Sequence, residues 1–294
     1  MRSVEVLYEK GLYSQSEKIL KRAKTYAEKL EKYPELLSVS EWEQTLLSKS
    51  SQFDKLNERI AHDLEMLKEF EAEREVKKTV FLIYSRVVKM GIARNDADIE
   101  SLRKLVFSPV LFEPNVKNFW SRHFVYVAQA LYYNTIGDFE KYHEYNEKIV
   151  KLMESKPQII CDQPTVYVHS LNNLCNAKIA TKRFAEIDAL IKKVRGIAEN
   201  KKTNIHRNAA ANIVFDTTDI EVYCCLKKGE FEKGKQLIEE AKKEIEKNKK
   251  FVSKSSELNL YYDAAYTYFI LGDYNSCLTW LNKILNDNDV DVRQ

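Results

Sequence analysis

The sequence contains few residues that break helices. Of its 294 residues, only seven are glycine and five are proline, whereas 31% are charged and 44% are hydrophobic. Such a composition favours long helices over sheets, because Lys, Glu, Leu and Ala are good helix formers while Gly and Pro are poor ones. The hydrophobic fraction is large enough to support a real core, so an all-α fold is expected.

Long apolar runs, cysteine motifs and a large charge excess are also missing. No run of 18 or more apolar residues occurs, and the N-terminal MRSVEVLYEKGLY carries charges inside its apolar stretch, so neither a membrane span nor a signal peptide is expected. The five cysteines show no C-x-x-C or C-x-x-H spacing, which favours a reducing, cytoplasmic location and no metal site. A net charge of +3 argues against a nucleic-acid partner held by phosphate contacts.

A short break recurs along the chain. It reads Gly137-Asp138-Phe139, Gly229-Glu230-Phe231 and Gly272-Asp273-Tyr274, and Lys182-Arg183-Phe184 fits the same frame without its glycine. The four aromatic residues are 45, 47 and 43 residues apart. Gly11-Leu12-Tyr13 fits near the start, 126 residues before Phe139, which equals three intervals of 42. Two weaker units are therefore expected near Phe53 and Ala97, which makes seven in all.

Each break combines the end of one helix with the start of the next. Glycine readily adopts the left-handed conformation that ends a helix, and the acidic residue after it favours the N-terminus of the following helix. Apolar residues then return at helical spacing, as at Cys277, Leu281 and Ile284. We therefore expect helical hairpins. The turn aromatics expected to be buried against the first helix of their own hairpin are Phe139, Phe184, Phe231 and Tyr274.

Two segments around these breaks resemble the tetratricopeptide repeat family. YDAAYTYFILGDYNSCLTWLNKIL resembles it in its first-helix aromatic, its Gly-Asp-Tyr and the small Cys277 that follows, and VYVAQALYYNTIGDFEKYHEYNEKIV is similar except for Tyr142 at a small-residue position. The resemblance covers most of the chain and implies a right-handed α-solenoid of about seven hairpins. The period of 40 to 47 residues exceeds the family's period of about 34 residues, so longer helices are expected. We expect residues 1–294 to form a single array within a longer protein.

Catalytic signatures are not apparent. The histidines lie in different units, and none stands beside a carboxylate and a nucleophile in a recognised spacing. No glycine-rich phosphate loop is present, and carboxylate pairs such as Glu239-Glu240 lie among lysines, as on a solvated helix face. The chain is therefore not expected to be an enzyme or to require a cofactor.

A groove lined by the first helices is the more promising site. In the tetratricopeptide family, residues 8, 11, 12 and 15 positions before the turn aromatic face this groove, and the resemblance carries these positions over to the present chain. The resulting candidates are His169, Asn172, Asn173, Asn176, Asp216, Asp219, Tyr223, Tyr262 and Asp263. Asparagine amides donate and accept hydrogen bonds as a peptide backbone does, so they suit an extended peptide. Alternatively, these amides only hydrate a solvent-filled channel.

The charges in the candidate groove favour one kind of partner. Next to the Asn-rich helix stand Asp216 and Asp219 rather than Lys or Arg, so a basic or neutral peptide fits better than a C-terminal carboxylate. The sequence leaves the oligomeric state undefined. It also leaves three functions open: a protein-binding scaffold or adaptor, a sensor domain of a peptide-responsive regulator, and an accessory domain of a larger enzyme. Protein or peptide binding by a scaffold is the preferred interpretation.

Overall fold

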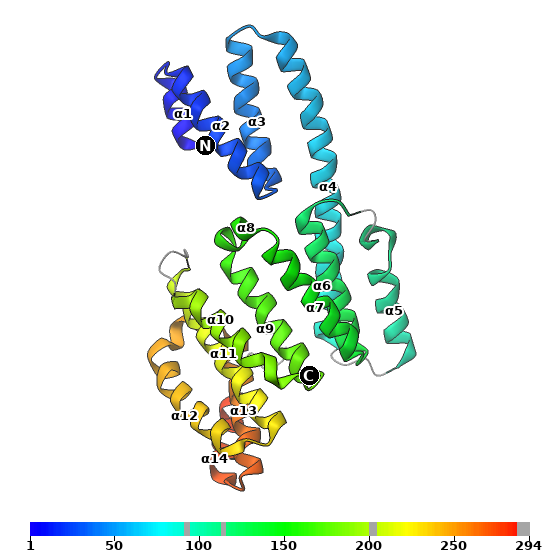
Figure 1. The fold of residues 1–294 in the computed structure, drawn as a ribbon, viewed down its shortest axis with the longest axis vertical. Helices are drawn as coiled ribbons and strands as arrows, with labels where there is room; N and C mark the ends of the chain where they lie inside the picture. The colour runs from blue at the N-terminus through cyan, green and yellow to red at the C-terminus, as the bar shows by residue number, and fades with distance from the viewer. Residues whose placement is uncertain (91–94, 113–115, 200–204, 287–294) are drawn as a thin grey trace. The chain divides into compact units, whose positions relative to one another are not determined.

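The structure is a computed structural model that describes residues 1–90, 95–112, 116–199 and 205–286 (Figure 1). Within these ranges all regular elements are helices and no strand occurs, which confirms the all-α prediction. Helices that follow one another in sequence pack side by side in many places along the chain. None of the described helices is long and apolar enough to cross a bilayer.

The helices gather into two compact units. Unit 1 consists of Met1–Ile83 and Arg103–Ala128, and unit 2 consists of Tyr84–Leu102 and Gln129–Gln294. Unit 1 contains α1 (Arg2–Glu9), α2 (Tyr13–Lys29), α3 (Tyr33–Lys49) and the 3-10 helix η1 (Pro109–Leu111). Unit 2 contains α7 (Phe139–Glu154), α8 (Pro157–Asp162), α9 (Pro164–Ala180), η3 (Phe184–Glu186), α10 (Ile187–Glu199), α11 (Arg207–Lys228), α12 (Phe231–Asn248), η4 (Lys249–Phe251), α13 (Lys254–Ile270) and α14 (Tyr274–Leu285). Three helices contribute residues to both units: α4 (Phe53–Met90), α5 (Asp96–Val106) and α6 (Phe119–Thr135).

The core of unit 2 forms where the apolar faces of consecutive helices meet. In the last hairpin, the small residues Ala264 and Ala265 are buried, so α13 and α14 approach closely. The Trp280 ring of α14 lies 5.3 Å from the Tyr261 ring of α13, measured between ring centroids. Ile238 of α12 joins the same buried cluster and links this hairpin to the one before it. Burial of such faces, rather than helix propensity alone, stabilises short helices of this kind.

The predicted breaks are turns in the structure. Gly11, Gly137, Gly229 and Gly272 all have φ between +72° and +79°, the left-handed conformation that ends a helix. Asp138 and Asp273 then cap the next helix, since each carboxylate accepts a hydrogen bond from a backbone N–H three residues on, at 3.1 Å. Ser51 and Lys182 adopt the same conformation without being glycine. The breaks near Phe53 and Arg183 are therefore also confirmed. Near Ala97, α4 ends at Met90 and α5 begins at Asp96, with 91–94 outside the described residues.

A pair of glycine substitutions should separate turn conformation from packing. Nothing lies within 4 Å of a Cβ added at Gly272 or at Gly196, but only Gly272 has a positive φ. We expect Gly272→Ala to lower the free energy of unfolding by about 1 to 2 kcal/mol through left-handed strain. Gly196→Ala, inside α10, should raise it by about 0.5 to 1 kcal/mol because alanine is the better helix former. Urea denaturation of both variants measures these changes, and a stabilising Gly272→Ala would contradict the assigned turn.

The hairpin pattern fails between Phe53 and Met90. Separate hairpins would require a turn in this segment, but α4 is one continuous helix of 38 residues. The segment contains no glycine or proline and is rich in Lys, Glu, Leu and Arg, so nothing in it ends a helix. The regular spacing of the other breaks therefore does not extend through α4, and the count of seven separate hairpins is wrong here.

The predicted burial of the turn aromatics is also wrong in part. Tyr274 is 62% exposed and Phe139 is 44% exposed, while Phe184 and Phe231 are half-buried. These residues occupy the first position after the turn, where the chain has just left the preceding helix. In the last hairpin the buried contacts are made one and two turns further on, by Cys277 and Trp280.

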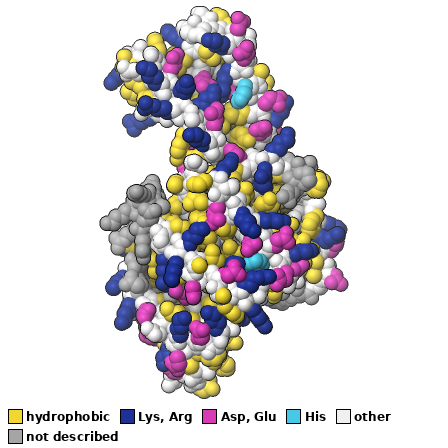
Figure 2. Space-filling model, viewed as in Figure 1, with side chains coloured by type: hydrophobic (Ala, Val, Ile, Leu, Met, Phe, Trp, Pro, Cys, Tyr) yellow, Lys and Arg dark blue, Asp and Glu magenta, His cyan; other side chains and the backbone are white. Residues whose placement is uncertain are grey.

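Charges of both signs are mixed on the surface. On the face shown in Figure 2, Lys and Arg side chains alternate with Asp and Glu, and exposed hydrophobic side chains lie between them. The totals are also nearly balanced, with 47 basic and 44 acidic residues. Local groups, rather than the net charge, therefore determine where a charged partner can bind.

Candidate functional site

A cleft of about 710 Å³ lies in unit 2, along the first helices of successive hairpins. Five of the nine predicted residues line it: Asn176 of α9, Asp219 and Tyr223 of α11, and Tyr262 and Asp263 of α13. The structure thus brings amide, carboxylate and phenol groups from three separate hairpins into one hollow. This arrangement provides both hydrogen-bonding groups and flat apolar surface for a ligand.

The cleft runs obliquely across the three helices. On α9 it is lined by the last turn, from Asn176 to Ala180, and on α11 by the second half, from Asp219 to Lys227. On α13 it is lined earlier in the helix, from Asn259 to Asp263. The position that faces the cleft therefore shifts from hairpin to hairpin. A fixed set of positions counted from the turn therefore includes only part of the lining.

The other four predicted residues lie outside the cleft lining. His169 and Asn173 are exposed on α9. Asn172 is buried, at 7% exposure, instead of being partly exposed as predicted, and its Nδ2 has no hydrogen-bond partner among the described residues. Asp216 is half-buried, and its Oδ1 accepts a hydrogen bond from Ser256 Oγ at 2.6 Å, which joins α11 to α13. Burial raises the pKa of Asp216 in spite of this hydrogen bond.

Several lining residues were not among the candidates. Tyr142 of α7 lines the cleft, and burial, followed by the nearby Tyr223, raises its pKa to about 12. In the sequence, Tyr142 is marked as unusual because the repeat family has a small residue at this position. Lys227 also lines the cleft, and its Nζ lies 5.0 Å from the centre of the Tyr223 ring. Lys182, in the left-handed turn after α9, brings a second cation to the lining.

Asp263 is an acid of the cleft lining whose pKa is strongly raised. It is buried, and this desolvation raises its pKa to about 7, while the positive charge of Lys227 acts in the opposite direction. Near neutral pH, this carboxyl group is therefore close to half ionised. A second cation placed beside it, in addition to Lys227, would favour the ionised form.

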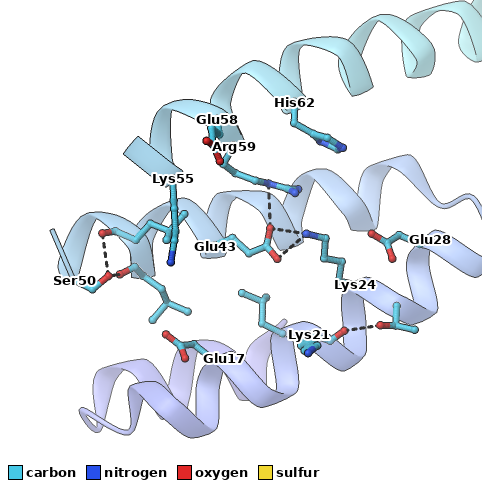
Figure 3. A pocket seen from close by; sticks show the side chains of 14 residues that line it. Glu17, Lys21, Lys24, Glu28, Glu43, Ser50, Lys55, Glu58, Arg59 and His62 are labelled. Carbon is cyan, nitrogen blue, oxygen red and sulfur yellow. Dashed lines mark hydrogen bonds and ion pairs between the residues drawn. The ribbon is translucent and has the colours of Figure 1, made fainter. Parts of the chain in front are cut away.

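A second hollow of about 710 Å³ lies in unit 1, between α2, α3 and the first turns of α4 (Figure 3). Figure 3 shows Lys24 and Arg59 converging on Glu43, with Lys24 Nζ 3.1 Å from Oε1 and Arg59 Nε 3.0 Å from Oε2. Arg59 Nε also lies 3.3 Å from Asp63 Oδ1. The central charges are thus paired with each other, and we assign the network to holding the three helices together rather than to a ligand.

Metal-ligating and redox-active groups are dispersed. In the described part of the chain, no group of three or more His, Cys, Asp or Glu side chains is placed to hold a metal ion. All five cysteines are unpaired, and only Cys161 is exposed. Burial raises the pKa of Cys175 to about 12, so this thiol is not activated as a nucleophile.

Comparisons with known proteins give no further guide to the site. Neither the scan of family models nor the searches of curated proteins and of solved structures finds a match to this chain.

Proposed function

We propose that this chain is a right-handed, tetratricopeptide-like solenoid whose unit 2 cleft binds an extended segment of a partner protein. The observation that carries the proposal is the lining of one hollow by the first helices of three consecutive hairpins. Tetratricopeptide-like hairpins would place their first helices on a concave surface in this way. The chain acts in this proposal as a scaffold or adaptor, without catalysis and without a cofactor.

The chemistry of the lining supports an extended peptide as the ligand. The Asn176 amide can donate to a backbone carbonyl and accept from a backbone N–H at the same time. The rings of Tyr223 and Tyr262 offer flat surfaces against which side chains of an extended chain can pack. Because peptide groups occur in every sequence, amide contacts of this kind provide affinity without restricting the peptide sequence.

Charge sets the preferred composition of the peptide. Asp219 and Asp263 bring acidic groups to α11 and α13, Lys227 lies close enough to Asp263 to favour its ionised form, and Lys182 lies in the turn after α9. A Lys or Arg side chain of the peptide fits beside the two carboxylates, above the Tyr262 ring. The proposed ligand is therefore a segment with one basic residue flanked by neutral ones, as part of a protein rather than a nucleic acid.

The cysteines support a reducing location. Four of the five are buried and none is paired, although Cys175 and Cys224 belong to the same buried cluster. Proteins of oxidising compartments commonly use such neighbouring thiols in disulfides. We accordingly place the proposed scaffold in the cytoplasm.

Two asparagines on one helix provide a matched test of the cleft. The probe is an array of extended peptides with and without a central Lys or Arg, followed by calorimetry on the binders. We expect Asn176→Ala to weaken the best binder by about tenfold, since it removes up to two hydrogen bonds of roughly 0.5 to 1.5 kcal/mol each. Asn173→Ala removes the same side chain from the same helix outside the cleft lining, and should leave the affinity unchanged.

Two outcomes would contradict the proposal. One is an array in which peptides with a central Lys or Arg bind no better than neutral or acidic ones. The other is a peptide whose affinity is equal for the parent chain, Asn176→Ala and Asn173→Ala. Circular dichroism of each variant ensures that a loss of affinity reflects the cleft rather than unfolding.

A further inference from the structure

The outer face of α14 is apolar and exposed. Tyr274, Leu278, Leu281 and Leu285 follow one another at i, i+4, i+7 and i+11, and so form one stripe along the helix. Tyr274 is 62% exposed, Leu278 57% and Leu285 73%, while Leu281 is just above one-third exposed. At the turn, Phe269 continues this surface, since its ring centroid lies 6.0 Å from that of Tyr274. We refer to the four residues of α14 as the end stripe.

In the hairpin before it, the equivalent positions contact the next hairpin. Tyr274 and Phe231 are 43 residues apart. By this interval, Leu278, Leu281 and Leu285 correspond to Lys235, Ile238 and Lys242 of α12. Ile238 is fully buried in the cluster that includes residues of α13 and α14. Lys235 Nζ lies 5.7 Å from the centre of the Tyr268 ring, and Lys242 Nζ lies 5.7 Å from that of Trp280.

The same positions in α10 behave alike. The interval of 47 residues between Phe184 and Phe231 relates Ile238 to Ile191 and Lys242 to Arg195. Ile191 is buried in a cluster with Ile220 of α11, and Arg195 forms an ion pair with Glu221 of α11. In both earlier hairpins this face of the second helix is therefore the surface on which the next hairpin docks. The end stripe is the same surface with leucines in place of the flanking charges.

The end stripe is also free of like charges that would oppose self-association. The only charged residue of α14 is Lys283, and its Nζ lies 4.2 Å from the centre of the Trp280 ring, next to the hairpin's own core. Symmetric pairs bring each residue of a patch near the same patch on the partner, so a patch with a net charge repels itself. A neutral row of leucines is complementary to a second copy of itself.

We propose that the end stripe is a homodimer interface, in which α14 of one chain packs against α14 of a second copy around a two-fold axis. The partner's leucines would contact the end stripe much as the next hairpin contacts the equivalent faces of α10 and α12. The inference does not depend on the unit 2 cleft. A single pair of helices gives an interface at the small end of the range for specific contacts, so we expect a dissociation constant on the order of micromolar.

Sedimentation velocity of the full chain, from about 1 to about 100 µM, tests this interface. We expect a reversible monomer–dimer equilibrium. Leu278→Glu should raise the dissociation constant at least tenfold, because both chains of a symmetric dimer bring the new negative charge to the interface. The matched control is Leu64→Glu, which places the same charge at a 56% exposed leucine of α4. It should dimerise like the parent chain.

A cysteine variant tests the symmetry independently. In a Cys161→Ser background, which removes the exposed thiol, Leu281→Cys should form a disulfide-linked dimer on mild oxidation, since the middle of the stripe meets itself across the axis. A chain that stays monomeric over the whole concentration range would overturn the proposal. So would a dimer that survives Leu278→Glu and dissociates in Leu64→Glu, which would assign the interface to α4.

Discussion

Replacement of Trp280 by alanine should lower the free energy of unfolding by about 3 to 5 kcal/mol, the usual cost of removing a large aromatic side chain from a core. Trp280 is 3% exposed and contacts the Tyr261 ring, and Lys242 and Lys283 both lie over its indole ring. Its removal would leave a cavity between α12, α13 and α14 and would expose the same buried cluster that includes Ile238. Urea denaturation followed by circular dichroism measures the loss.

Tyr274→Ala is the matched control for this prediction. It also removes an aromatic ring from α14, but from a position that is 62% exposed, so we expect a change within about 0.5 kcal/mol. Both variants are measured at concentrations below the proposed dimerisation, since Tyr274 belongs to the end stripe. An equal loss for the two variants would show that the exposed turn aromatic contributes as much packing as Trp280, and would contradict the assignment of Trp280 as the main packing anchor of the hairpin.

Asp263→Asn should stabilise the chain at pH 8 by roughly 2 to 4 kcal/mol and leave its stability at pH 4 nearly unchanged. Burial raises the pKa of Asp263 from 3.8 to about 7, so the folded state retains a proton that the unfolded state has already released. Stability contributed by this group is therefore fully present below pH 4 and falls as the pH rises towards about 7. Asparagine resembles the protonated acid and carries no charge to desolvate.

The difference between variant and parent isolates this effect from the other titrating groups. Urea denaturation at intervals between pH 4 and pH 8 gives that difference directly. Asp273→Asn provides a control of opposite sign, because hydrogen bonds from Ser276 lower the pKa of Asp273. It should destabilise the chain slightly at high pH and not at low pH. A parallel pH dependence of the Asp263→Asn variant and the parent would refute the assigned burial of this carboxyl group.

The turns were predictable because they depend on local chemistry. A glycine at the left-handed position followed by an acidic cap at Asp138 or Asp273 specifies a helix end and a helix start within four residues. The recurrence of the frame then located the turn at Lys182, which has no glycine. Within α4 the spacing predicted a turn that the structure does not have, because no helix-breaking residue stands in this segment.

The burial of the turn aromatics and the lining of the unit 2 cleft were predictable only in part, because both depend on how neighbouring hairpins are rotated against each other. The sequence marks Tyr274 as the first residue of a helix but does not say which way its side chain points. Likewise, Asn172 and Asn176 share a face of α9, yet only Asn176 lines the cleft, because the cleft crosses α9 at its last turn. The angle of that crossing is a property of several helices together, and no single repeat contains it.

The continuous α4 restricts how the length of this chain can change. Its 38 residues extend for about 57 Å without a turn, and Met66, Val76, Val80 and Ile83 are all buried along it. One residue inserted between Met66 and Val76 would rotate everything after it by about 100° around the helix axis, and would carry the later three side chains away from their neighbours. An insertion beside Ser51 falls in a turn whose residues 50–53 are all exposed, so it does not shift a buried side chain within that turn. Insertions and deletions should therefore be tolerated at the exposed turn around Ser51 and selected against inside α4.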